Sequence, residues 1–122
     1  MPLVPTPGES EARAGEVLLT GIAAGPGIAV GPARIVAGLD DFARFRPGDV
    51  LVCRTTSPAW TPLLANACAV VTETGGMAAH AAIVAREFGI PAVLAATGAM
   101  TTLTEGEPVR VDGTHGHVGR TR

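Results

Sequence analysis

The stretch that decides the fold covers residues 72–93 and reads TETGGMAAHAAIVAREFGIPAV. An apolar run at residues 69–72 leads into it and predicts a buried strand, because β-branched residues dominate this run. The Gly75-Gly76 pair ends the strand, and a helix is expected over about residues 79–88. Gly89 suits the left-handed residue that often follows a helix. The segment therefore predicts a strand, a glycine turn and a helix.

Elements of the same kinds are expected on both sides of this segment. Gly31-Pro32 is predicted to separate two strands, and Ser57 is predicted to cap a helix with Pro58 in its first turn. Strands are expected at residues 17–20, 28–30, 33–36, 50–53, 69–72, 92–94, 108–112 and 117–118, with further helices at about 57–67 and 98–103. A β-rich N-terminal half followed by alternating strands and helices predicts an α/β domain with a mostly buried sheet.

Length and composition favour one compact domain. A chain of 122 residues is the size of a single domain, and its core must be built from aliphatic residues because only 3% of the residues are aromatic. Residues 1–16 are rich in proline, glycine and acidic groups, so we expect a flexible leader or linker there and the folded domain at residues 17–122.

Charge and cysteine content exclude several classes of function. The net charge is −2 and no basic patch is evident, which argues against a nucleic-acid partner. Two long uncharged runs lie at residues 17–33 and 55–72. The first contains four glycines and two prolines and the second contains two prolines and Asn66, so we expect no membrane-spanning helix. Two cysteines are too few for a disulfide framework, so we expect a cytoplasmic location.

His80 is the candidate catalytic residue. It is expected in the first turn of the helix, where backbone N–H groups of residues 76–80 lack intrahelical partners and attract anions. A nucleophile beside an anion-binding loop is what covalent phosphoryl carriage requires. From these residues alone, a role of His80 as a capping or partly buried side chain remains open.

The same residues resemble the phosphohistidine motif of the phosphoenolpyruvate-utilising enzymes, with His80 as the matching histidine. Residues 21–34 look like the entry hairpin of that family, and residues 50–58 are similar to its strand and Thr-rich turn. Residues 106–116 resemble its closing strand and Asp-Gly turn. The resemblance implies a swivelling β/β/α domain in which His80 carries a phosphoryl group between two distant sites.

The resemblance also implies partners and cofactors outside this segment. It implies an ATP-grasp-like nucleotide-binding domain, a phosphoenolpyruvate-, pyruvate- or other acceptor-binding domain, and Mg-ATP or phosphoenolpyruvate bound on those domains. No cofactor is expected on this domain, which would be the carrier part of a phosphotransferase and not a complete enzyme. The family has hydroxyl residues where this chain has Ala78 and Ala79. A catalytically silent docking module is therefore the alternative.

The other candidate site residues lie around the histidine. Gly75, Gly76 and Met77 are expected to bind phosphate through the loop backbone. Thr74 could direct its hydroxyl toward His80 or act only as a turn residue.

Arg86 matches the motif arginine of the resembled family. It could bind phosphate or an acidic partner, or form a solvated helix face with Glu87. Met77 is expected to be a packing residue if it is not functional. No metal site is expected, because the remaining candidate ligands lack the spacing of a metal site: Cys53, Cys68, His115 and His117.

Overall fold

The computed structural model describes residues 16–121 and contains eight strands and three α-helices in this range. The predicted leader lies outside the described residues except for Glu16, whose carboxylate contacts Arg120 at 3.3 Å. The strands are β1 (Val17–Thr20), β2 (Ile22–Gly25), β3 (Ile28–Ile35), β4 (Val50–Cys53), β5 (Ala69–Thr72), β6 (Ala92–Leu94), β7 (Pro108–Asp112) and β8 (His117–Arg120). The helices are η1 (Leu39–Arg44), η2 (Pro58–Trp60), α2 (Thr61–Asn66), α3 (His80–Phe88) and α4 (Ala99–Thr102), of which η1 and η2 are 3₁₀.

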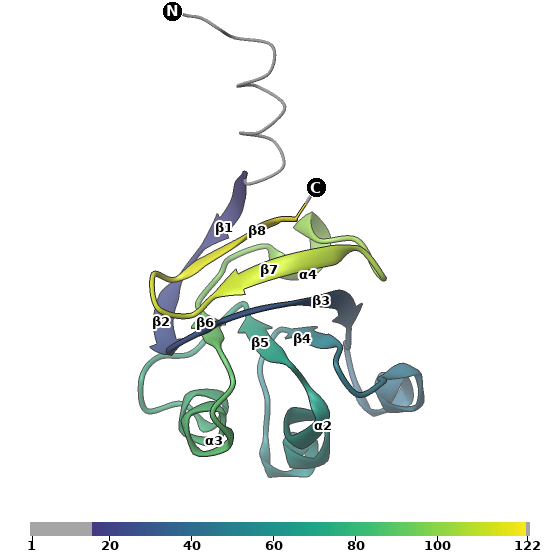
Figure 1. Cartoon of the computed structure of the whole chain (residues 1–122). Coiled ribbons are helices and arrows are strands. Elements are labelled where there is room, and N and C mark those ends of the chain that lie inside the picture. The colour runs from purple at the N-terminus through teal and green to yellow at the C-terminus, as the bar shows by residue number, and fades with distance from the viewer. Residues whose placement is uncertain (1–15, 122) are drawn as a thin grey trace, which may run out of the picture.

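The strands follow the order β1-β8-β7-β3-β4-β5-β6-β2. β3, β4, β5 and β6 are parallel neighbours, whereas β1, β8, β7 and β3 pair in antiparallel fashion. Figure 1 shows the two parts as layers, with β7 and β8 in one layer and α2 and α3 beyond the parallel strands on the opposite side. This β/β/α arrangement confirms the predicted α/β class.

Two apolar clusters hold the layers together. In β4 successive side chains point to opposite faces, so Val50 and Val52 pack between the strand layers while Leu51 and Cys53 pack toward the helices. All four are fully buried, as a parallel strand covered on both faces requires. Trp60 packs edge-on against Phe42 at 5.1 Å between ring centroids, at the margin of the helix-side cluster.

The predicted break at Gly31-Pro32 is wrong, because β3 runs without interruption from Ile28 to Ile35. It pairs with β7 through residue 32 and with β4 from residue 33. Pro32 therefore lies where β3 changes its partner strand from β7 to β4. A missing N–H at this residue removes little of the hydrogen bonding between the strands. The expected entry hairpin is also wrong, since β2 pairs with β6 and not with β3.

The helix expected at about residues 57–67 is divided into η2 and α2. Pro58 lies in the first turn as predicted, but the Ser57 side chain makes no capping hydrogen bond. The short helix η1 was not predicted, and none of its residues is buried, so no apolar periodicity marks it.

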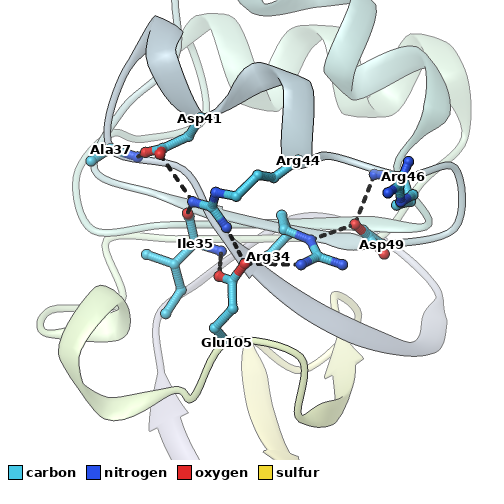
Figure 2. Close-up of polar contacts among 8 residues, drawn as sticks. All are labelled: Arg34, Ile35, Ala37, Asp41, Arg44, Arg46, Asp49 and Glu105. Atoms are coloured by element: carbon cyan, nitrogen blue, oxygen red, sulfur yellow. Dashed lines mark hydrogen bonds and ion pairs between the residues drawn. The ribbon is translucent and has the colours of Figure 1, made fainter.

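A network of charged side chains connects β3 to the helix η1 and to two loops (Figure 2). Arg34 donates to Asp49 at 2.8 Å and to Glu105 at 2.9 Å. Arg44 donates to the same oxygen of Glu105 and pairs with Asp41 at 3.0 Å. Asp49 also accepts the N–H of Arg46 and has 3% of its side chain exposed. Its charge is compensated inside the fold by Arg34.

The carboxylates of this network make the stability of the fold depend on pH. Burial alone would raise the pKa of Glu105, but the N–H of Ile35 and the two arginines outweigh burial and lower it below the ordinary value of 4.5. The N–H of Ala37 and the guanidinium of Arg44 lower the pKa of Asp41. Such carboxylates stabilise the folded state above their unfolded-state pKa, and this contribution is lost as the pH falls through the folded-state pKa.

Glu105→Gln is therefore expected to lower the free energy of unfolding at pH 7 by about 0.5–1 kcal/mol, since Glu105 is partly exposed. It should also flatten the decline in stability below about pH 4.5. Urea denaturation at pH 7 and pH 4 checks both effects. Glu87→Gln is the control, because Glu87 is exposed and its side chain makes no hydrogen bond or ion pair with residues 16–121. Equal pH profiles for the two variants would contradict the role of the network.

Candidate active site

His80 is the first residue of α3 and is half-buried. The helix begins here because Ala79 has an extended backbone while its carbonyl accepts the N–H of Ile83 at 3.1 Å. It ends as predicted, with Gly89 in the left-handed conformation (φ 72°) and its N–H bonded to Ala85. The strand–turn–helix prediction places the imidazole correctly in the first turn.

Two threonine hydroxyls hold the imidazole ring. Thr56 Oγ1 lies 2.8 Å from Nδ1 of His80, and Thr61 Oγ1 lies 3.4 Å from Nε2. Thr56 belongs to the turn after β4, and Thr61 begins α2. Neither threonine was predicted as a site residue, although the Thr-rich turn at residues 50–58 was an available signal for Thr56. Nδ1 is thus the more firmly held nitrogen, and Nε2 is the freer one.

The glycine loop exposes backbone donors immediately before the helix. Gly75 has φ +111°, and a Cβ there would lie 3.2 Å from the Cβ of Ala79, so glycine is required. A Cβ at Gly76 would meet only open space. Within residues 16–121, the N–H groups of Gly76, Met77 and Ala78 find no backbone acceptor. These groups are available to an anion.

Thr74 and Met77 differ from what the sequence suggested. The hydroxyl of Thr74 donates to the carbonyl of Arg54 at 3.1 Å, which fits the turn interpretation and not a bond to His80. Met77 is 51% exposed, so its interpretation as a packing residue is wrong. Contact of either residue with phosphate stays a prediction.

Arg86 binds the protein backbone. Its Nη1 donates to the carbonyl of Ala24 at 2.9 Å, and its Nη2 donates to the carbonyl of Met77 at 2.8 Å. This geometry differs from the expected solvated pair with Glu87, and contact of Arg86 with phosphate stays a prediction. The guanidinium connects the end of β2 to the glycine loop.

The remaining cysteines and histidines do not gather around His80. Burial raises the pKa of the Cys53 thiol to about 12, so this thiol is unreactive. His115 Nδ1 lies 2.9 Å from Asp112 Oδ2, and the hydrogen bond from His115 lowers the pKa of Asp112. His117 stacks on His115 at 6.1 Å. In the part of the chain that the structure describes, no three potential metal-ligating side chains form a cluster.

Comparison with known proteins places this site in a family. The model of the PEP-utilising enzyme mobile domain matches residues 45–116, more than half of the chain, and this range contains Thr56, Thr61, His80 and Arg86. The chain belongs to the PEP-utilising enzyme mobile-domain family.

Relatives of this mobile domain are much longer proteins. The phosphotransferase YvkC of Bacillus subtilis is 51% identical over 98 residues, which cover 80% of this chain and 12% of YvkC. The phosphoenolpyruvate synthase of Aeropyrum pernix is 46% identical over 92% of this chain and 14% of its own length. That of Escherichia coli is 41% identical over 86% of this chain and 13% of its own length. The mobile domain therefore spans about an eighth of these relatives.

Solved structures share the fold. Enzyme I, determined in solution, is 31% identical with a TM-score of 0.53 over 60% of this chain and 30% of that chain. The holo-form of aconitase X from Thermococcus kodakaraensis is 19% identical with a TM-score of 0.61, over 83% of this chain and 95% of that chain. The second likeness concerns the fold alone. No helix within residues 16–121 is long and apolar enough to cross a membrane.

Thr56→Val is expected to slow the phosphorylation that the sequence predicts for His80 about tenfold, because the hydrogen bond that fixes the ring at Nδ1 is lost. The folded structure should remain, since valine has nearly the shape of threonine. Thr55→Val is the control, because Thr55 is exposed and its side chain makes no hydrogen bond to residues 16–121. Rates of phosphoryl incorporation, measured under equal donor concentrations, check this result. Equal rates for the two variants would contradict the assigned role of Thr56.

Proposed function

We propose that this domain is a phosphoryl carrier that accepts a phosphoryl group on Nε2 of His80 and delivers it to a second site. The observation that carries the proposal is the position of His80 at the start of a nine-residue helix, with Nδ1 held by Thr56 and unpaired N–H groups in the preceding loop. The family match supports it, because relatives include phosphoenolpyruvate synthases and a phosphotransferase.

The proposed transfer uses the lone pair of Nε2. With the ring proton on Nδ1 and shared with Thr56, Nε2 attacks the phosphorus atom of the donor. The Nε2–P bond forms as the P–O bond to the donor breaks, and the leaving oxygen keeps the electron pair. The loop N–H groups bind the charged phosphoryl oxygens.

The Thr56 hydroxyl can form a hydrogen bond with Nδ1 of His80 both before and after Nδ1 loses its proton. Phosphorylation at Nε2 makes the ring cationic, so Nδ1 readily releases its proton to solvent. A hydroxyl accepts from Nδ1–H before this release and donates to the Nδ1 lone pair after it. In the second transfer Nδ1 takes a proton back from solvent, an acceptor attacks phosphorus, the Nε2–P bond breaks, and Nε2 recovers its electron pair, which restores the neutral imidazole.

The donor and acceptor belong to partner domains in this proposal. The chain contains no lysine to hold a triphosphate, and it spans about an eighth of its relatives. Mg-ATP or phosphoenolpyruvate would bind to an ATP-grasp-like or phosphoenolpyruvate-binding domain, and none of these ligands to the mobile domain itself. Cys53 and Cys68 are free thiols, and we propose the cytoplasm as the location.

A silent docking module is the second candidate, because Ala78 and Ala79 provide no hydroxyl in the loop. The test uses E. coli phosphoenolpyruvate synthase from which its own mobile domain has been deleted, together with radiolabelled phosphoenolpyruvate. The carrier role predicts acid-labile label on this chain. The deleted E. coli domain, added separately, is the positive control. Labelling of that control but not of this chain would favour the docking module.

A further inference from the structure

Arg86 joins two backbone segments that the sequence separates by about fifty residues. One is the end of β2, where the carbonyl of Ala24 accepts from Nη1 at 2.9 Å. The other is the glycine loop before His80, where the carbonyl of Met77 accepts from Nη2 at 2.8 Å. The two nitrogens of one planar group thus fix two carbonyls at a set separation.

The β2 end of this link is a β-bulge. The β2–β6 register shifts between Ala23 and Gly25, so Ala24 has no opposite residue in β6. Ala24 is 1% exposed, and a buried carbonyl at such an irregularity in the strand pairing needs a hydrogen-bond donor. Arg86 supplies it, which explains why an arginine on an exposed helix position bonds inward.

The loop end of the link is the segment that the proposed function uses. Met77 lies between Gly76 and Ala78, and the N–H groups of these three residues are the anion donors. The loop is mostly exposed, and few packing contacts define its path. The bond from Arg86 to the Met77 carbonyl orients the Met77–Ala78 peptide plane and with it the N–H of Ala78, because a carbonyl and the next N–H share one plane.

We infer that Arg86 is a positioning residue: it fixes the Gly76–Ala78 loop against the bulge in β2 so that the loop N–H groups face the phosphoryl group on His80. This inference rests on the proposed carrier function and deepens it. It differs from the interpretation of Arg86 as a phosphate ligand, because the hydrogen bonds that its two terminal nitrogens make in the structure go to backbone carbonyls.

The test compares Arg86→Lys and Arg86→Ala in the full chain, with potassium phosphoramidate as a small-molecule donor that releases ammonia on transfer. Lysine keeps the charge but cannot bridge two carbonyls with a planar fork. We expect both variants to reduce the maximal rate of His80 phosphorylation about fivefold to tenfold, with little change in the half-saturating donor concentration. Amide hydrogen exchange at residues 76–78 should accelerate in both. Arg110→Ala, which removes an exposed arginine from β7, is the control for charge.

Four results would overturn the inference. A wild-type rate for Arg86→Lys, or a change only in the half-saturating concentration, would identify a charge ligand of the phosphate. Unchanged rates in both variants, or unchanged loop exchange, would remove the positioning role. Failure of the carrier function itself gives a different pattern. In the wild-type protein, His80 is then phosphorylated no faster than His115 and His117. Amide hydrogen exchange at residues 76–78 still accelerates when Arg86 is replaced.

Discussion

His80→Ala is expected to lower phosphoryl incorporation from the donor enzyme by more than about a thousandfold, to the background level. The variant removes the imidazole whose Nε2 is the proposed nucleophile. The fold should persist, because His80 is half-buried and alanine favours the first turn of a helix. Phosphoryl incorporation is measured as filter-bound radioactivity after a fixed reaction time. Circular dichroism checks that the variant is folded.

The other two histidines are the matched controls. His115 and His117 lie at the β7–β8 turn, and His115 is engaged by Asp112. His115→Ala and His117→Ala should each retain wild-type incorporation. Label that persists in a folded His80→Ala protein would refute the mechanism.

Gly116→Ala is expected to destabilise the fold by about 3–5 kcal/mol, a large share of the stability of a small domain. Gly116 has φ +78°, which is strained for alanine, and a Cβ there would clash with the carbonyl oxygen of Gly21. The carbonyl of Gly116 also accepts the N–H of Gly21 at 2.9 Å. The substitution therefore separates the β7–β8 turn from the β1–β2 connection.

Gly106→Ala separates backbone strain from the clash. Gly106 has φ +82°, but a Cβ there has open space, so the expected loss is only about 1 kcal/mol. Urea denaturation followed by Trp60 fluorescence measures both variants, since Trp60 packs against Phe42 in the folded state. Equal losses would show that the approach of Gly116 to Gly21 is unimportant for stability.

Short-range sequence patterns predicted the strands β4 and β5 and the helix α3, next to which or on which the site residues lie. The apolar runs at β4 and β5, the helix α3 and its end at Gly89 were expected from the sequence and are confirmed. Each depends on short-range chemistry, such as β-branched runs and the left-handed preference of glycine. The same reasoning placed His80 in the first turn of α3.

Features that depend on distant segments were not predictable in this way. The pairing of β2 with β6 and the continuity of β3 through Pro32 are set by partner strands far along the chain. The contact of Thr56 with His80 and the bonds of Arg86 to two carbonyls likewise join segments that only the tertiary fold brings together. Local propensity carries no information on such pairings.

Phosphorus and imidazole-nitrogen NMR of the labelled domain show directly which atom carries the phosphoryl group. The carrier mechanism predicts one phosphorus atom bonded to Nε2 of His80. Acid should hydrolyse this linkage, whereas mild base should not. Phosphate on the hydroxyl of Thr56 or Thr61, both within 3.4 Å of the ring, would survive acid and contradict the account. Phosphorus bonded to His115 or His117 would contradict it equally.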